Sequence, residues 1–326
     1  FSMTAQKIRF TGAGRLFERP QAVYQMLFDS QGLRFTQEPD GITVFGRLRP
    51  GAFKLPGDVS SQFVSGLMFA APLMESDSLI EVLPPYESRS YVDLTLDSMQ
   101  QFGIKVAQRA RKNGSVVYRI PAPQSYTACD VTIEGDYSQA AFLAVLGCVL
   151  GGVTVTGLNP ESKQGDKVIM DILQRCGGKC KAVDGGLKFG RSLLKATEID
   201  LADCPDLGPI LFTLGCFCSG ETILRNAGRL RIKESDRIAA MQTELEKMGA
   251  RIQVEGDTVY IYGTALRAPE RPLNGHNDHR IVMALAVAAA AGGVPATILG
   301  AEAVNKSWPA FWQVLQALGE RVEFEE

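Results

Sequence analysis

The chain repeats a pattern about every seventy residues, and this period constrains its fold more than any other feature of the sequence. Five stretches with helical apolar spacing each end in a glycine, and an alternating strand pattern follows each glycine. The five glycines are Gly32, Gly103, Gly177, Gly249 and Gly319, which are 71, 74, 72 and 70 positions apart. A spacing this regular is typical of repeated supersecondary units. We therefore expect a fold built by repetition of one small motif.

The other half of the repeat is a helix rich in small apolar residues that leads into a β-branched strand. Such helices open at 57–63, 135–142, 205–208 and 277–280. Because a strand pair follows each glycine-stopped helix, one unit reads β-α-β-α-β-β. Helices rich in Ala, Gly and Leu require burial on most sides, so they should lie inside the sheets. We expect an α/β fold of two inside-out domains made from these units.

The units divide unevenly between the two domains. We place the boundary between residues 133 and 134, which leaves about one and a half units in the N-terminal domain (1–133) and three in the C-terminal domain (134–326). Two domains of three units each would need roughly a hundred more residues at this period. The sequence therefore predicts an N-terminally truncated chain.

Composition excludes several classes of partner. With 326 residues, 45% of them hydrophobic, and a net charge of -2, the chain is not expected to bind nucleic acid or a membrane surface. Its notable apolar run, 281–291, is too short to cross a bilayer. Seven cysteines without a disulfide-type spacing favour a reducing cytoplasm. With only two histidines in the chain, we do not expect a zinc site.

The heptad Arg231–Arg237 carries the clearest chemical signal. It holds three cations and two carboxylates directly before a helical apolar pattern, with Ser235 as the expected N-cap and Arg237 in the first turn. Cations at a helix start oppose the helix dipole unless an anion is bound there. The heptad therefore predicts a phosphate or carboxylate site, although a solvated, salt-bridged helix start would have the same pattern.

Other helix openings carry similar residues. Asp278 is the expected N-cap of a helix whose first turn holds His279 and Arg280, and Lys306 precedes the last helix. Singly, each is more often a cap or a surface charge. Together they occupy the same end of successive repeats, so we expect them to converge on one cleft between the domains. The remaining candidates at helix openings are Arg15, Ser60, Ser61, Gln62, Ser88 and Tyr91.

These motifs resemble the family of 3-phosphoshikimate 1-carboxyvinyltransferases, also called 5-enolpyruvylshikimate-3-phosphate synthases. The resemblance is colinear over essentially the whole chain and rests on the runs at 14–20, 57–63, 231–237, 277–280 and 305–309. It implies the enolpyruvyl transferase fold, with two domains that close on the substrates. It also implies transfer of the enolpyruvyl group of phosphoenolpyruvate to the 5-hydroxyl of shikimate 3-phosphate, with release of phosphate, in the shikimate pathway of chorismate and aromatic amino-acid biosynthesis. The implied reaction requires no metal or organic cofactor. We also expect the protein to be a cytoplasmic monomer.

The resemblance also implies residue roles. Asp206, Lys233 and Glu234 would be catalytic, with Asp206 as the candidate base for the attacking hydroxyl and Glu234 the candidate for proton transfer at the methylene carbon. Shikimate 3-phosphate would be bound by Ser60, Ser61, Gln62, Ser88, Tyr91, Asp206 and Lys233. Phosphoenolpyruvate would be bound by Arg15, Gln62, Arg237, His279, Arg280 and Lys306, with Glu234 beside it.

Two features depart from the family pattern. The family's N-terminal Lys-Ser pair has no counterpart after Phe1, so we expect these 326 residues alone to have little or no activity. Arg229 stands where some relatives have an asparagine. Three alternatives stay open: a UDP-N-acetylglucosamine enolpyruvyl transferase, which would carry a reactive cysteine near Arg15–Pro20; an RNA-phosphate cyclase, which would be basic; and a non-catalytic binding fragment.

Overall fold

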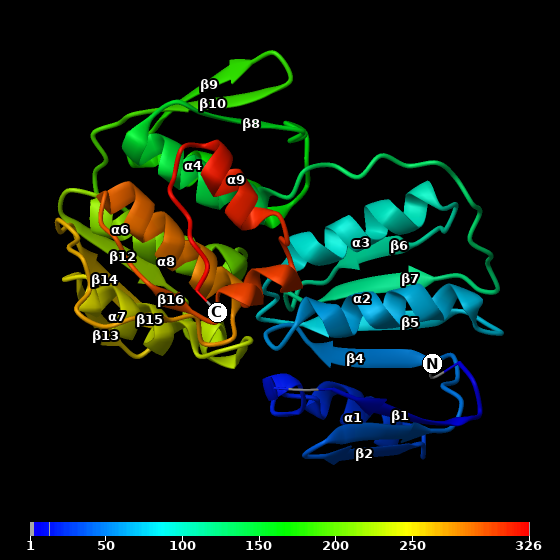
Figure 1. Ribbon diagram of the computed structural model, residues 1–326. Helices are drawn as coiled ribbons and strands as arrows, with labels where there is room; N and C mark the ends of the chain where they lie inside the picture. Colours follow the sequence, from blue (N-terminus) through cyan, green and yellow to red (C-terminus); the bar gives the residue numbers. More distant parts are fainter. Residues whose placement is uncertain (1–2, 13, 326) are drawn as a thin grey trace. The chain divides into compact units, whose positions relative to one another are not determined.

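The computed structural model describes residues 3–12 and 14–325, and the chain divides into two compact units. Unit 1 is Phe1–Thr132 and unit 2 is Ile133–Glu326. In Figure 1 unit 1 runs from blue to cyan-green and unit 2 from green to red. The division falls one residue before the boundary expected from the sequence.

In the described part of unit 1, residues 3–12 and 14–132, the chain forms two sheets and three α-helices. The first sheet is antiparallel, with the order β1 (Lys7–Thr11), β3 (Gly41–Phe45), β2 (Arg34–Glu38). The second has the order β4 (Ala52–Pro56), β5 (Ser78–Leu83), β7 (Val116–Ile120), β6 (Ala107–Ala110), and only β4 and β5 are parallel. The helices are α1 (Ala22–Ser30), α2 (Ser61–Ala70) and α3 (Arg89–Gln101), with short 3-10 helices η1 (Gly14–Phe17) and η2 (Ala71–Leu73). One apolar core joins them.

Residues 133–325, the described part of unit 2, form three sheets. The first is β8 (Val153–Thr156), β10 (Gly186–Gly190), β9 (Lys179–Val183) in that order. The second is β11 (Glu198–Asp200), β12 (Glu221–Arg225), β14 (Thr258–Tyr262), β13 (Arg251–Glu255), and the third is the parallel pair β15 (Leu273–Asn274) and β16 (Ile298–Leu299).

Six α-helices and four 3-10 helices are described in unit 2. The α-helices are α4 (Tyr137–Leu150), α5 (Ile169–Arg175), α6 (Gly208–Phe217), α7 (Arg237–Lys247), α8 (His279–Gly292) and α9 (Phe311–Ala317). The 3-10 helices are η3 (Gly165–Val168), η4 (Pro205–Leu207), η5 (Gly228–Ile232) and η6 (Ala301–Lys306).

Helices α4, α6 and α8 lie inside unit 2 and contact one another, with the sheets around them (Figure 1). They are buried along most of their length. The hydroxyl of Thr213 on α6 donates to the carbonyl of Ala284 on α8 at 3.0 Å, which satisfies a buried polar group between two apolar helices. The expected inside-out arrangement is therefore confirmed for this unit.

The repeat is complete in two places. The segments β4-α2-β5-α3-β6-β7 and β11-α6-β12-α7-β13-β14 both read β-α-β-α-β-β, and their sheets share one order, in which the fourth strand lies between the second and the third. The five glycines that set the period all have positive φ, from 67° at Gly32 to 99° at Gly319. A left-handed residue after the last helical turn is the usual helix stop, and glycine adopts it without strain.

The other two repeats of unit 2 are less regular than expected. Within the described residues, no ladder strand precedes α4, and no strand pair follows α9. Before α4, Val131 and Ile133 are exposed, so the alternating apolar pattern there has no buried face to drive strand pairing. The prediction of three full β-α-β-α-β-β units in this domain is therefore wrong in detail, although the four helices that open at Tyr137, Gly208, Arg237 and His279 are all present.

Candidate active site

The candidate site of unit 2 is assembled by helix starts. Asp278 caps α8, and its Oδ1 accepts the backbone N–H of Arg280 at 3.0 Å, as the sequence predicts. Helix α7 is capped by Asp236, whose Oδ1 accepts the N–H of Ile238 and of the residue after it at 3.1 Å each. The prediction that Ser235 caps this helix is wrong. Its buried hydroxyl instead donates to Asp278 Oδ2 at 3.0 Å, which links the starts of α7 and α8.

Arg237, the first residue of α7, is the buried anchor of the site. Its side chain is 1% exposed and reaches three carboxylates. Nε donates to Asp278 Oδ2 at 2.9 Å, Nη1 to Asp206 Oδ1 at 3.2 Å, and Nη2 to Glu234 Oε2 at 2.7 Å. Burial alone would lower the pKa of Arg237, but Asp278 and Asp206 raise it above its ordinary value. The guanidinium therefore stays charged and fixes three acidic side chains in one place.

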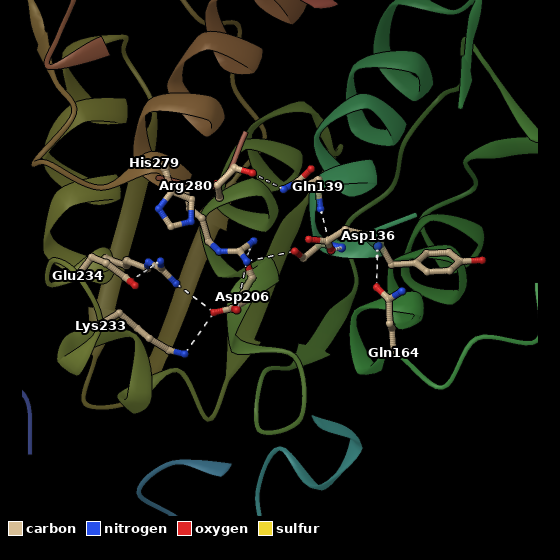
Figure 2. Close-up of polar contacts among 12 residues, drawn as sticks. Asp136, Gln139, Gln164, Asp206, Lys233, Glu234, His279 and Arg280 are labelled. Atoms are coloured by element: carbon tan, nitrogen blue, oxygen red, sulfur yellow. Dashed lines mark hydrogen bonds and ion pairs between the residues drawn. The ribbon is translucent and has the colours of Figure 1, made fainter. Parts of the chain in front are cut away.

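Asp206, in η4, is the carboxylate on which the cations converge. Lys233 Nζ donates to Oδ1 at 3.2 Å, and Arg280 Nη2 donates to Oδ2 at 3.2 Å (Figure 2). Arg280 Nη1 also donates to the backbone carbonyl of Asp206 at 3.3 Å. Burial would raise the pKa of Asp206, yet the charges of Arg280, Lys233 and Arg237 hold it well below its usual range. This side chain is ionised throughout the neutral range.

Two further groups have shifted proton affinities. Burial lowers the pKa of Lys233, and the positive charges of Arg237 and Arg229 lower it further, against the opposing effect of Asp206. Burial and the neighbouring Arg280 lower the pKa of His279, so its ring is mainly neutral at pH 7. His279 Nδ1 is buried and has no hydrogen-bond partner in the described structure. Because its pKa is lowered, Lys233 releases a proton more readily than a free lysine does.

Helix α4 brings residues to the site that sequence reasoning missed. Ser138 Oγ accepts from Arg280 Nη2 at 3.1 Å, and Gln139 Nε2 donates to the carbonyl of Ser307 at 2.9 Å. Figure 2 shows Gln139 and the α4 cap Asp136 on the opposite side of Arg280 from Glu234 and Lys233. A signal was present, because the run at 135–142 occupies the same place in its repeat as the run that contains Arg280.

Lys306, at the end of η6, is attached to the loop before α8. Its Nζ donates to the side-chain Oδ1 of Asn277 at 2.7 Å and also to the Asn277 carbonyl. Because Asn277 directly precedes Asp278, the residue that Lys306 contacts is the sequence neighbour of the carboxylate that holds Arg237. In unit 2 the structure therefore groups seven predicted site residues: Asp206, Lys233, Glu234, Arg237, His279, Arg280 and Lys306.

Apart from Arg15, the predicted residues of unit 1 lie at two neighbouring helix starts. Ser60 caps α2, and its hydroxyl accepts the N–H of Gln62 at 3.3 Å, while Ser61 is buried in the first turn. Ser88 has φ 52° and is 1% exposed, and Tyr91 lies in the first turn of α3.

These two helix starts meet at one edge of a sheet. Helices α2 and α3 follow the parallel neighbours β4 and β5, and parallel strands end at the same edge of a sheet. The loops after the two strands are joined by the N–H of Glu87, which donates to the carbonyl of Gly57 at 3.1 Å. Arg15, in η1, is exposed and pairs with Glu18 at 3.1 Å. No recorded hydrogen bond or ion pair within the described part of unit 1 joins Arg15 to the other predicted residues.

Among residues 3–12 and 14–325, no group of three or more His, Cys, Asp or Glu side chains is arranged to hold a metal ion. In the same part of the chain, no helix has the length and apolar character needed to cross a bilayer.

Comparisons with known proteins identify the family. Residues 1–315 match the family model of EPSP synthase (3-phosphoshikimate 1-carboxyvinyltransferase). A 3-phosphoshikimate 1-carboxyvinyltransferase of Clostridium kluyveri is 40% identical over 325 residues, covering 98% of this chain and 74% of the relative. Another, of Clostridium acetobutylicum, is 41% identical over 320 residues, covering 96% of this chain and 72% of the relative.

Solved structures share the fold. An EPSP synthase of Acinetobacter baumannii matches with a TM-score of 0.74 at 22% identity, covering all of this chain and 76% of the other. The enolpyruvyl transferase NikO of Streptomyces tendae matches with a TM-score of 0.74 at 18% identity, covering 99% of this chain and 74% of the other. The fold and family predictions are confirmed, the predicted truncation stays a prediction, and the rival families are not favoured. The chain belongs to the EPSP synthase (3-phosphoshikimate 1-carboxyvinyltransferase) family.

Proposed function

We propose that the cationic cluster of unit 2 is the part of the active site that binds phosphoenolpyruvate. As a member of its family, the chain is a transferase that moves the enolpyruvyl group of phosphoenolpyruvate to the 5-hydroxyl of shikimate 3-phosphate and releases phosphate. The observation that supports this use of the cluster is the convergence of Lys233, Arg237 and Arg280 on the single carboxylate of Asp206. A phosphate and a carboxylate need several such donors.

The proposed ligands of phosphoenolpyruvate are cations and hydrogen-bond donors. Arg280 and His279 lie in the first turn of α8, where backbone N–H groups and the helix dipole add to their attraction for an anion. The exposed Lys306 can turn from Asn277 toward a ligand without leaving a buried charge behind. Arg15 and Gln62 of unit 1 complete the proposed set.

Shikimate 3-phosphate has a proposed set of ligands in each unit. In unit 1, Ser60, Ser61, Gln62, Ser88 and Tyr91 present hydroxyl and amide groups at the starts of α2 and α3. In unit 2, Asp206 and Lys233 suit the ring hydroxyls, because a carboxylate accepts and an ammonium donates.

The reaction needs a base and an acid at different atoms. When the 5-hydroxyl oxygen bonds to C2 of phosphoenolpyruvate, its proton leaves and C3 gains a proton, which gives a tetrahedral adduct. The C2–O bond to phosphate then breaks and C3 loses a proton, which restores the double bond and releases inorganic phosphate. We assign Asp206 to the hydroxyl proton and Glu234, with Lys233, to the proton at C3. The lowered pKa of Lys233 suits a group that transfers protons.

We further propose that the protein acts as a cytoplasmic monomer without nucleic-acid or membrane partners. Its seven cysteines are all free, which suits a reducing compartment. A net charge of -2 gives no general attraction for polyanions.

Calorimetric titration of the chain with each substrate tests the assignment. Replacing Lys306 or Arg280 by Ala removes a charge-assisted contact, which should weaken phosphoenolpyruvate binding about 10- to 150-fold. The Lys306→Ala change should leave the affinity for shikimate 3-phosphate within about threefold of the wild-type value, because Lys306 belongs only to the proposed phosphoenolpyruvate ligands. Lys188→Ala, at an exposed lysine of β10, is the matched control and should change neither affinity. Equal losses for both substrates in Lys306→Ala would refute the separation of the two ligand sets.

A further inference from the structure

Glu244 on α7 is a buried carboxylate that the proposed reaction does not use. Its side chain is 1% exposed, and it accepts three hydrogen bonds. Oε2 accepts from Lys247 Nζ at 2.7 Å and from the backbone N–H of Asn274 at 2.8 Å, and Oε1 lies 3.1 Å from His276 Nε2. Burial would raise the pKa of Glu244, but the hydrogen bonds from Lys247, Asn274 and His276 hold it below its usual value. Two of the three partners, Asn274 at the end of β15 and His276, lie in the segment Asn274–Asn277 that leads into α8, which we call the loop.

That loop has an unusual backbone. His276 and Asn277 have φ values of 50° and 51°, so two consecutive residues with side chains adopt the left-handed conformation. Such a conformation persists only where the surroundings hold it. The side-chain Oδ1 of Asn274 accepts the N–H of His276 at 2.7 Å, which makes a local turn. Glu244 contacts both Asn274 and His276, and Lys306 contacts Asn277, so the loop is held from both of its ends.

The loop also connects Glu244 to the anion-binding cluster. Asn277 presents its carbonyl and its Oδ1 to Lys306. Asp278, the next residue, holds Arg237 and caps α8. A shift of the loop would therefore move an acceptor of Lys306 and the start of α8 together. A glutamine at position 244 would have nearly the same size and shape but no negative charge, so it tests the carboxylate without opening a cavity.

We propose that Glu244 is a positioning residue for the anion site: by fixing the loop Asn274–Asn277, it holds Lys306 and the start of α8 in the geometry that binds phosphoenolpyruvate. The inference rests on the proposed function, because it takes Lys306 as a ligand of that substrate. Glu244 itself contacts none of the proposed substrate ligands through a recorded hydrogen bond in the described chain.

Hydrogen exchange measured by mass spectrometry tests the loop directly and does not depend on any ligand. In Glu244→Gln, amides of 274–280 and 301–307 should exchange about tenfold faster. The matched control is Glu246→Gln, the same change at an exposed residue of the same helix, which should leave both segments unchanged. If Glu244→Gln fails to fold, His276→Asn removes one of the three contacts at a partly exposed position and suits a left-handed backbone. Unchanged exchange in the folded variant, or in His276→Asn if Glu244→Gln does not fold, would overturn the proposal.

A double-mutant cycle for phosphoenolpyruvate binding separates positioning from general destabilisation. Glu244→Gln should weaken binding by calorimetry about 2- to 13-fold, the effect of one ordinary hydrogen bond. In the Lys306→Ala background the same change should have a clearly smaller effect, because one of its two targets is already absent and only the start of α8 remains. Full additivity of the two changes would overturn the positioning role. If Lys306→Ala alone leaves phosphoenolpyruvate binding intact, the proposed function fails at that residue, and the exchange result still decides whether Glu244 fixes the loop.

Discussion

Replacing Asp278 by Asn should destabilise unit 2 strongly, because it leaves a buried cation without its main partner. Asp278 is 0% exposed and its Oδ2 accepts from Arg237 Nε at 2.9 Å, while the Arg237 side chain is only 1% exposed. Breaking a buried ion pair by removing one partner costs about 3–5 kcal/mol. For a unit of this size each kcal/mol lowers Tm by about 2–4 °C, which gives a loss of about 6–20 °C.

The same substitution at Asp136 is the matched control. Asp136 caps α4, Asp278 caps α8, and both helices have 14 residues. Asn is as good an N-cap as Asp, so Asp136→Asn should cost at most about 1 kcal/mol, from the lost charge at the helix start. Only Asp278 also pairs with Arg237, so the difference between the two variants measures that ion pair.

Tryptophan fluorescence during urea unfolding is the appropriate assay. The two tryptophans of the chain, Trp308 and Trp312, both lie in unit 2, so the signal reports the unit that is perturbed. We expect the midpoint of Asp278→Asn to fall far below that of Asp136→Asn, with similar slopes. Losses of unfolding free energy that agree within about 0.5 kcal/mol would refute the assignment of Arg237 and Asp278 as a buried, mutually dependent pair.

Two further outcomes follow from the structure. The difference in unfolding free energy between wild type and Asp278→Asn should be constant from about pH 8 to 5 and should narrow below about pH 4. The pKa of Asp278 is lowered in the folded state. Its contribution to stability is therefore present above the pKa of the unfolded state and is lost as the pH falls through the pKa of the folded state. Urea unfolding at a series of pH values checks this, and a gap that widens in acid would contradict it. Gly147→Ala should cost about 1–3 kcal/mol, because its Cβ would lie 2.6 Å from Phe189 Cβ and 2.9 Å from Val153 Cβ. Gly190→Ala, whose nearest contact is 3.7 Å, serves as its control, and equal losses would count against this packing of α4.

The repeat made the fold predictable from sequence. A helix that stops at the same place in every repeat needs a residue in the left-handed conformation there. The glycines that stop these helices all adopt it: Gly32, Gly103, Gly177, Gly249 and Gly319. The ends of unit 2 were not predictable in the same way. The exposed Val131 and Ile133 follow a strand pattern, but pairing depends on a neighbouring edge that local sequence does not specify.

The site was predictable in its residues and not in its contacts. Helix starts with cations pointed to Arg237 and Arg280, because a charge opposed to the dipole is a local signal. The contact between Ser138 and Arg280 joins residues 142 positions apart and depends on the packing of α4 against α8. The choice of Asp236 over Ser235 as the cap of α7 likewise depends on a tertiary partner, since Ser235 is drawn away by Asp278.

The balance of charge in the cluster gives Asp206 a specific role. Three cations there meet three carboxylates: Lys233, Arg237 and Arg280 with Asp206, Glu234 and Asp278. Because these charges balance, an anionic substrate gains the most binding energy where it replaces a carboxylate as the acceptor of hydrogen bonds from the cations. Asp278 is fully buried and cannot give way, whereas the Asp206 side chain is 24% exposed. As a substrate draws Arg280 away from Asp206, the main cause of its depressed pKa weakens, and the carboxylate becomes a better base. Substrate binding would thus activate Asp206, the residue that we assign to the hydroxyl proton. A carboxylate that was already a strong base before binding would not gain basicity from the substrate in this way.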